Sequence, residues 1–125
     1  MEKATFQDLI AKKLQRENDK LKITEVVVPS MGKALVFKKP SDDVLVNLID
    51  DIGDGKDMHA IVGAYKRLIY MTCTALQDQK LHSELDVVDP YDVVDVLFDV
   101  TDVMQIGAAL SDFVGLGGVG DDVKN

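Results

Sequence analysis

The chain has 125 residues, of which 46% are hydrophobic, and a formal net charge of −8. This size and composition predict one folded domain with a real core and exclude a disordered chain. The charge is uneven, because residues 1–80 contain 13 Lys/Arg and 12 Asp/Glu whereas residues 81–125 contain 1 and 10. The acidic C-terminal third disfavours nucleic acid and anionic membrane as partners.

Cysteine usage and hydropathy indicate the compartment. Cys73 is the only cysteine, so no intrachain disulfide can form and a reducing compartment fits best. No apolar run approaches the roughly 20 residues that a membrane-spanning helix needs. The segment 1–8 has no apolar signal core. We therefore expect a soluble cytosolic domain.

The N-terminal part predicts a helix followed by a β-hairpin. Thr5 and Asp8 have the spacing of a short capping box at the start of the helix. The apolar positions that follow helical spacing are Phe6, Leu9, Ile10, Leu14 and Leu21. A β-branched segment, 23–28, and a second short strand, 34–37, flank the turn at 29–32. A hairpin at about 23–38 is marginal alone and must pack on helices.

Residues 41–114 predict further helices. Ser41 is a good N-cap for a helix that ends at Gly53. Residues 58–76 show the clearest helical periodicity. Cys73 lies near the apolar face of that helix, where we expect a buried structural thiol. The connection 77–88 is polar and less regular, and it has room for one turn of helix. Asp89-Pro90-Tyr91-Asp92 is a strong helix-start signal, and Asp99 or Thr101 can cap the last helix.

The predicted fold is α+β and mainly α-helical, with about five helices and one hairpin inserted after the first helix. We expect a single domain over residues 1–114 and a flexible glycine-rich tail over 115–125.

Two short motifs resemble ligand sites but lack the required context. The G-x-G-x-x-G pattern at 115–120 follows a predicted helix, whereas a dinucleotide loop must follow a strand. A calcium loop starting at Asp50 would have Ile52 and Ile61 at positions that must supply oxygen ligands. Neither segment predicts a cofactor or metal.

The remaining reactive residues also have ordinary interpretations. His59 and His82 have no cysteine or acid pair at zinc-like spacing, so we expect surface or boundary histidines. No nucleophile motif is present in the sequence. We therefore expect no catalytic residue, no cofactor and no metal.

The most regular pattern is a row of aspartates every three or four residues, with valine in most gaps. Its members are Asp86, Asp89, Asp92, Asp95, Asp99 and Asp102. The row allows a carboxylate cluster for metal, an acidic face that mimics nucleic acid, or capped helix starts with a solvated face. We favour the third, because carboxylates on one exposed helix face form no convergent cavity. In that interpretation Asp86 and Asp95 are ordinary surface charges.

Three segments in this order resemble the XkdN-like tail assembly chaperones of tailed phages, defective prophages and phage-derived contractile particles. They are AKKLQR at 11–16, VVVPSMG at 26–32 and DPYDVVDVLF at 89–98. The resemblance covers about residues 5–114 and includes no catalytic signature. It implies a non-enzymatic protein of the bacterial cytosol that coats the tape measure protein, prevents its aggregation and recruits tail tube subunits. Such chaperones are usually absent from the finished particle, and related families often have a second product extended by ribosomal frameshifting.

We hypothesise a partner surface on the last two helices, although core is the more common position for any single one of these side chains. Its proposed members are Leu97, Phe98, Ile106, Leu110 and Phe113. A basic group on and after the first helix is either a solvated face or a contact with the acidic third of another copy. Its members are Lys12, Lys13, Arg16, Lys20 and Lys22.

The alternative function is an acidic phage-encoded inhibitor or nucleic-acid mimic that binds a host DNA-processing protein. It requires rows of exposed carboxylates. Engagement of the aspartates as helix caps would count against it.

Overall fold

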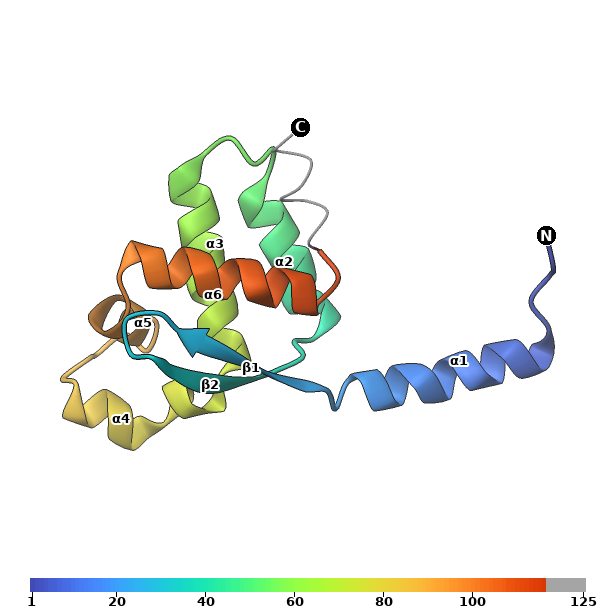
Figure 1. Ribbon diagram of the computed structural model, residues 1–125, viewed down its shortest axis with the longest axis horizontal. Helices are drawn as coiled ribbons and strands as arrows, with labels where there is room; N and C mark the ends of the chain where they lie inside the picture. Colours follow the sequence, from blue (N-terminus) through green and yellow to red (C-terminus); the bar gives the residue numbers. More distant parts are fainter. Residues whose placement is uncertain (117–125) are drawn as a thin grey trace.

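The structure, a computed structural model, describes residues 1–116 and has a mainly helical α+β fold, as predicted (Figure 1). Within these residues are six α-helices, one 3₁₀ helix and a two-stranded antiparallel hairpin after the first helix. The elements are α1 (Phe6–Asp19), β1 (Ile23–Val28), β2 (Lys33–Lys38), α2 (Asp42–Ile52), α3 (Met58–Thr72), η1 (Thr74–Gln77), α4 (Gln79–Glu84), α5 (Asp92–Leu97) and α6 (Val100–Phe113).

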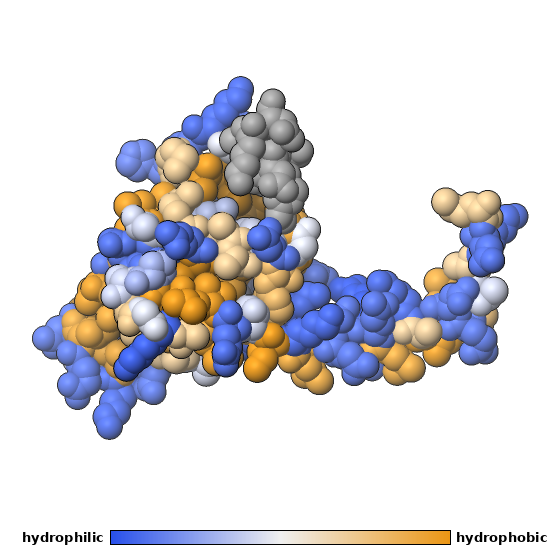
Figure 2. Space-filling model, viewed as in Figure 1, coloured by the Kyte–Doolittle hydropathy of each residue, from blue (hydrophilic) through white to orange (hydrophobic). Residues whose placement is uncertain are grey.

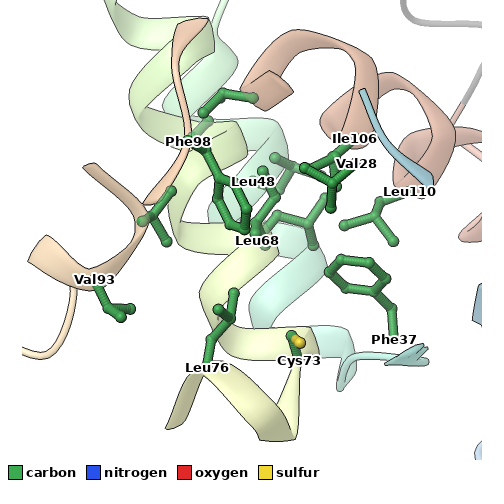
Figure 3. Close-up of a cluster of buried hydrophobic side chains, with 14 residues drawn as sticks. Val28, Phe37, Leu48, Leu68, Cys73, Leu76, Val93, Phe98, Ile106 and Leu110 are labelled. Carbon is green, nitrogen blue, oxygen red and sulfur yellow. The ribbon is translucent and has the colours of Figure 1, made fainter. Parts of the chain in front are cut away.

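Helix α3 is the centre of a body formed by all elements except α1. It packs against α2, α5 and α6, while the hairpin lies against α6 and η1 (Figure 1). Buried side chains from the hairpin, α2, α3, η1, α5 and α6 form one continuous core (Figure 3). The segment after α5 adds Phe98 to this core. The fold therefore has a single hydrophobic core, and the hairpin closes one side of it.

The hairpin joins the core through alternate residues. In its antiparallel register Thr24 faces Phe37 and Val26 faces Leu35. Phe37 and Val28 are fully buried, whereas Val36, which points to the opposite side of the strand, is 49% exposed. This alternation gives the two strands one apolar face, which supplies the packing that an isolated hairpin lacks.

The predicted helix caps at Thr5, Ser41 and Asp99 are confirmed. The Thr5 hydroxyl accepts a hydrogen bond from the Asp8 amide at 3.2 Å, and the Asp8 carboxylate accepts one from the Thr5 amide at 2.8 Å. Ser41 accepts from the Val44 amide at the start of α2. Gly53 ends α2 with a positive φ of 61°, a conformation that favours glycine. These boundaries follow from local chemistry and were therefore readable in the sequence.

The region after α3 differs from the prediction. The periodic segment 58–76 is divided, because α3 ends at Thr72 and a 3₁₀ turn follows. Cys73 is buried at the break, as expected of a structural thiol, and burial raises its pKa. The expectation of a surface or boundary histidine is wrong for His82, which is 6% exposed. Its ring is buried with Nε2 2.7 Å from the Leu76 carbonyl oxygen, because α4 folds back over η1.

Gly115 and Leu116, assigned to a flexible tail, instead form an ordered turn directly after α6. Gly115 has a φ of 85°, and the Leu116 amide donates to the Ser111 carbonyl at 2.8 Å. Leu116 also packs against the core. The remainder of the predicted tail, 117–125, lies outside the described residues. No helix over residues 1–116 combines the length and apolarity that crossing a membrane requires.

Candidate interaction surfaces

Helix α1 leaves the body as a separate arm (Figure 1). Every residue of this helix except Asp19 is exposed. The apolar stripe, which we define as Phe6, Leu9, Ile10 and Leu14 of α1 together with Leu21 just after it, has exposed fractions of 73, 62, 44, 56 and 79%. Figure 2 shows apolar atoms along the lower edge of the arm in that view. A run of exposed apolar side chains with helical spacing is typical of a protein–protein contact.

The arm is held outward by contacts at its C-terminal end. The Arg16 guanidinium lies 2.8 Å from the Asp42 carboxylate at the start of α2. The Lys22 ammonium lies 2.9 Å from Asp19, and the amides of Leu21 and Lys22 donate to carbonyls three residues earlier. These contacts order the turn into β1 and direct α1 away from its own core. In this conformation the stripe is available to another molecule.

A second candidate surface is a groove between α2 and α3, which we call the α2–α3 groove. Its volume is about 110 Å³. The lining residues are Val44, Asn47, Leu48, Asp51, Ala64, Arg67, Leu68, Met71 and Tyr91. Met71 is 38% and Tyr91 44% exposed, so the apolar lining reaches the surface. The groove therefore exposes apolar side chains together with the polar residues Asn47, Asp51 and Arg67.

The elements around this groove are acidic. Helix α2 contains four aspartates and no lysine or arginine, and residues 81–116 contain eight acidic residues and no lysine or arginine. Arg67, the cation among the lining residues, lies 2.6 Å from Asp51, which is the acidic residue of the lining, and Lys66 on α3 lies 2.6 Å from Asp95. The lining of the groove is therefore neutral, and the acidic side chains belong to the elements around it.

The partner surface predicted on the last two helices needs correction. Phe98, Ile106 and Leu110 are 6, 0 and 1% exposed, because they pack into the core against other elements. Phe113 is half-buried and Leu97 is 37% exposed. Since three of the five side chains are inaccessible, these residues do not form one surface in this fold. The accessible apolar stripe is on α1 instead.

The aspartate row is interrupted by tertiary packing. Helix α5 ends at Leu97, and Phe98 adopts an extended conformation with its side chain in the core. Helix α6 then begins after Asp99, whose carboxylate accepts a hydrogen bond from the Asp102 amide at 2.8 Å. Asp89 accepts from the Tyr91 amide, and α5 begins only at Asp92, three residues after the expected cap. The aspartates thus do not share one helical face.

Four of the six aspartates have structural partners. Asp89 and Asp99 accept from backbone amides, Asp95 pairs with Lys66, and Asp102 is buried. Asp95 is therefore more than an isolated surface charge. The metal interpretation gains no support, because the described residues contain no group of three or more potential ligands that could hold a metal ion. This engagement of carboxylates also counts against the nucleic-acid mimic.

Asp102 has a role that the sequence pattern did not reveal. Its carboxylate accepts from the Ser30 amide at 3.0 Å and from the Ser30 hydroxyl at 2.6 Å, although the residues are 72 positions apart. These bonds join the hairpin turn to the first turn of α6. The hydrogen bond from the Ser30 hydroxyl is the main reason that the pKa of Asp102 lies below its usual value of 3.8. No local signal marks a contact of this range.

The Asp102–Ser30 contact predicts an acid-sensitive contribution to stability. Because the folded state lowers the pKa of this carboxyl, its contribution is complete above about pH 5 and decreases as pH falls through the folded pKa. Asp102→Asn should lower Tm at pH 7 by about 5 °C. The difference from wild type should shrink towards pH 3. Thermal unfolding from pH 7 to 3 tests this, with the exposed Asp86→Asn as control. A constant difference across this range would contradict the ionic role.

Comparisons with known proteins give no further assignment. No protein-family model matches the chain, and no curated protein or solved structure is significantly similar to it. The functional interpretation therefore depends on the residues and on the two surfaces described above.

Proposed function

We propose that this protein is a non-enzymatic phage tail assembly chaperone that binds the tape measure protein and helps to recruit tail tube subunits. The observation that carries the proposal is the α1 arm, whose apolar stripe is exposed along its whole length. The sequence resemblance to XkdN-like chaperones supports the same role. In this proposal the protein acts in the bacterial cytosol and is not retained in the finished particle.

The arm suits a long helical partner such as the tape measure protein, which we call the client. A helix can lay its apolar stripe against a matching stripe on another helix, with anchors at i, i+3, i+4 and i+7. Five apolar side chains provide a weak contact, which matches a ligand that must be displaced later during assembly. Many copies bound along one client would supply the total affinity through multivalency. The body of each copy then remains free to contact tail tube subunits.

Charge substitutions within the stripe test this proposal. Leu9→Glu combined with Leu14→Glu should abolish the ability of the protein to keep co-expressed tape measure protein soluble. Neither side chain is buried, so Tm should change by less than about 2 °C. The readout is the fraction of tape measure protein in the cleared lysate.

The matched control is Gln7→Glu combined with Gln15→Glu, which adds the same two charges to exposed positions of α1 outside the stripe. This control should solubilise the client as well as wild type does. Full solubility of the client with the Leu9 and Leu14 variant would contradict the proposal. An equal loss of client solubility with both variants would show an effect of the added charge only.

A further inference from the structure

We infer that the free edge of β1 binds an extended, β-branched segment of a partner protein that carries a lysine or arginine opposite Glu25. The hairpin is the only sheet within residues 1–116, so each of its strands has one edge without a neighbouring strand (Figure 1). Such an edge can accept a further strand, whose backbone supplies the missing hydrogen bonds. The site lies on the body and does not involve the α1 stripe, so it goes beyond the proposed function.

Three residues of β1 direct their backbone groups away from β2. The Lys39 amide donates to the Lys22 carbonyl at 3.0 Å, one pair beyond the start of the strand register. Hydrogen-bonded and non-hydrogen-bonded pairs alternate along an antiparallel ladder. The amides and carbonyls of Ile23, Glu25 and Val27 therefore point to the outer edge of the hairpin.

No hydrogen bond within the described residues uses these outward groups. Helix α6 packs against β1, yet the backbone bonds beside the ladder involve only Val28 and the preceding Lys22. An unpaired backbone group is costly to bury, so the outward amides and carbonyls face solvent. The edge of β1 therefore has three N–H and three C=O groups available to another chain.

The side chains distinguish this edge from that of β2. Strand β2 begins and ends with lysine, Lys33 and Lys38, and lysines protect sheet edges from unwanted pairing. In β1 five of the six residues are β-branched and Glu25 is the single charge. Ile23 and Val27 on either side of it are 64 and 59% exposed. An incoming strand therefore meets an apolar edge with one negative position.

The charge favours a foreign strand over a second copy. Glu25 takes part in no salt bridge within residues 1–116. If two β1 edges paired antiparallel with their outward residues aligned, the Glu25 side chains of the two copies would lie opposite each other. Like charges directly opposite are destabilising, whereas opposite charges attract. The occupant that fits is therefore a basic strand.

A synthetic peptide tests the edge directly. The probe is Thr-Val-Thr-Lys-Thr-Val-Thr with blocked ends, which can place its lysine opposite Glu25 and its valines opposite Ile23 and Val27. In an NMR titration the amides of these three residues should shift and exchange more slowly with solvent. The amides of Ala34 and Val36, which point to the edge of β2, should not change. Unchanged β1 amides at about 1 mM peptide would overturn the inference.

Backbone methylation of the peptide is the matched control. Methyl groups on the amide nitrogens of its lysine and of its second valine remove donors that face β1. This change should weaken binding at least about tenfold. Methyl groups on the amides at the third and fifth positions face away from β1 and should leave binding almost unchanged. Equal effects of the two methylations would contradict strand pairing.

Two proline variants locate the site on the protein. Val27→Pro removes an outward amide of β1 without removing a bond to β2 and should weaken peptide binding about fivefold. Val36→Pro makes the same change at the edge of β2 and should bind as wild type does. Thermal unfolding of each variant verifies that the body remains folded. Equal weakening by both would contradict a site on β1.

A charge exchange tests the chemistry of the partner. Glu25→Lys should bind the lysine peptide about threefold more weakly and should prefer a peptide with glutamate in place of that lysine. An unchanged preference would overturn the requirement for a basic strand.

Two further measurements separate this inference from its alternatives. If the β1 amides are protected without peptide, and protection increases with protein concentration, a second copy occupies the edge and the inference is wrong. The variant with Leu9→Glu and Leu14→Glu should bind the peptide as wild type does. Loss of client binding and loss of peptide binding are therefore distinct results, and each tests a different proposal.

Discussion

Replacing Phe37 by alanine should lower the free energy of unfolding by about 3–5 kcal/mol. Phe37 is completely buried and is the largest side chain that β2 contributes to the core (Figure 3). Removing its ring deletes buried apolar surface and leaves a cavity that neighbouring elements fill only in part. The loss is large relative to the 5–15 kcal/mol that stabilises a typical domain. Denaturation by urea, followed by circular dichroism, measures it.

Val36→Ala is the matched control for this change. Val36 is the preceding residue of the same strand and is 49% exposed, so it tests strand propensity without core packing. We expect a loss of about 0.5 kcal/mol or less. Similar losses at both positions would show that the hairpin does not depend on Phe37 for its attachment.

Gly107→Ala should destabilise the fold by about 2–3 kcal/mol. A Cβ at this position of α6 would lie 2.2 Å from Cδ2, 2.3 Å from Cγ and 2.8 Å from Cβ of Tyr65. Rotation of the tyrosine ring cannot relieve the last contact, because a Cβ atom moves only with its backbone. Helices α3 and α6 would have to separate, and they form a principal contact of the body.

Gly63→Ala is a control that should change stability in the opposite direction. A Cβ at this position of α3 would meet only the end of the Arg67 side chain, at 4.0 Å. Alanine has a better helix propensity than glycine, so we expect stabilisation by about 0.5–1 kcal/mol. Chemical denaturation of both variants tests the pair. Stabilisation by Gly107→Ala would show that the α3–α6 contact is looser than the structure indicates.

The arm connects the functional predictions with these stability predictions. Phe37 and Gly107 act within the body, whereas substitutions in the α1 stripe should leave its unfolding almost unchanged. A variant such as Leu9→Glu with Leu14→Glu therefore separates client binding from folding.

The sequence by itself determined the elements that depend on local chemistry. Thr5 with Asp8, Ser41, Gly53 and Asp99 mark helix ends because each satisfies backbone groups within three or four residues. The hairpin and the mainly helical fold class followed from periodicity in the same way. The amphipathic character of α1 was also readable from spacing alone.

Only the tertiary structure decided which apolar faces are covered. An apolar stripe shows that a face favours burial but does not specify the partner, so Ile106 and Leu110 became core while Leu9 and Leu14 remained exposed. The same limit applies to Asp102, because its bond to Ser30 joins residues 72 positions apart and leaves no local pattern. Local interactions are encoded over a few residues, whereas burial and long-range contacts depend on how the whole chain packs.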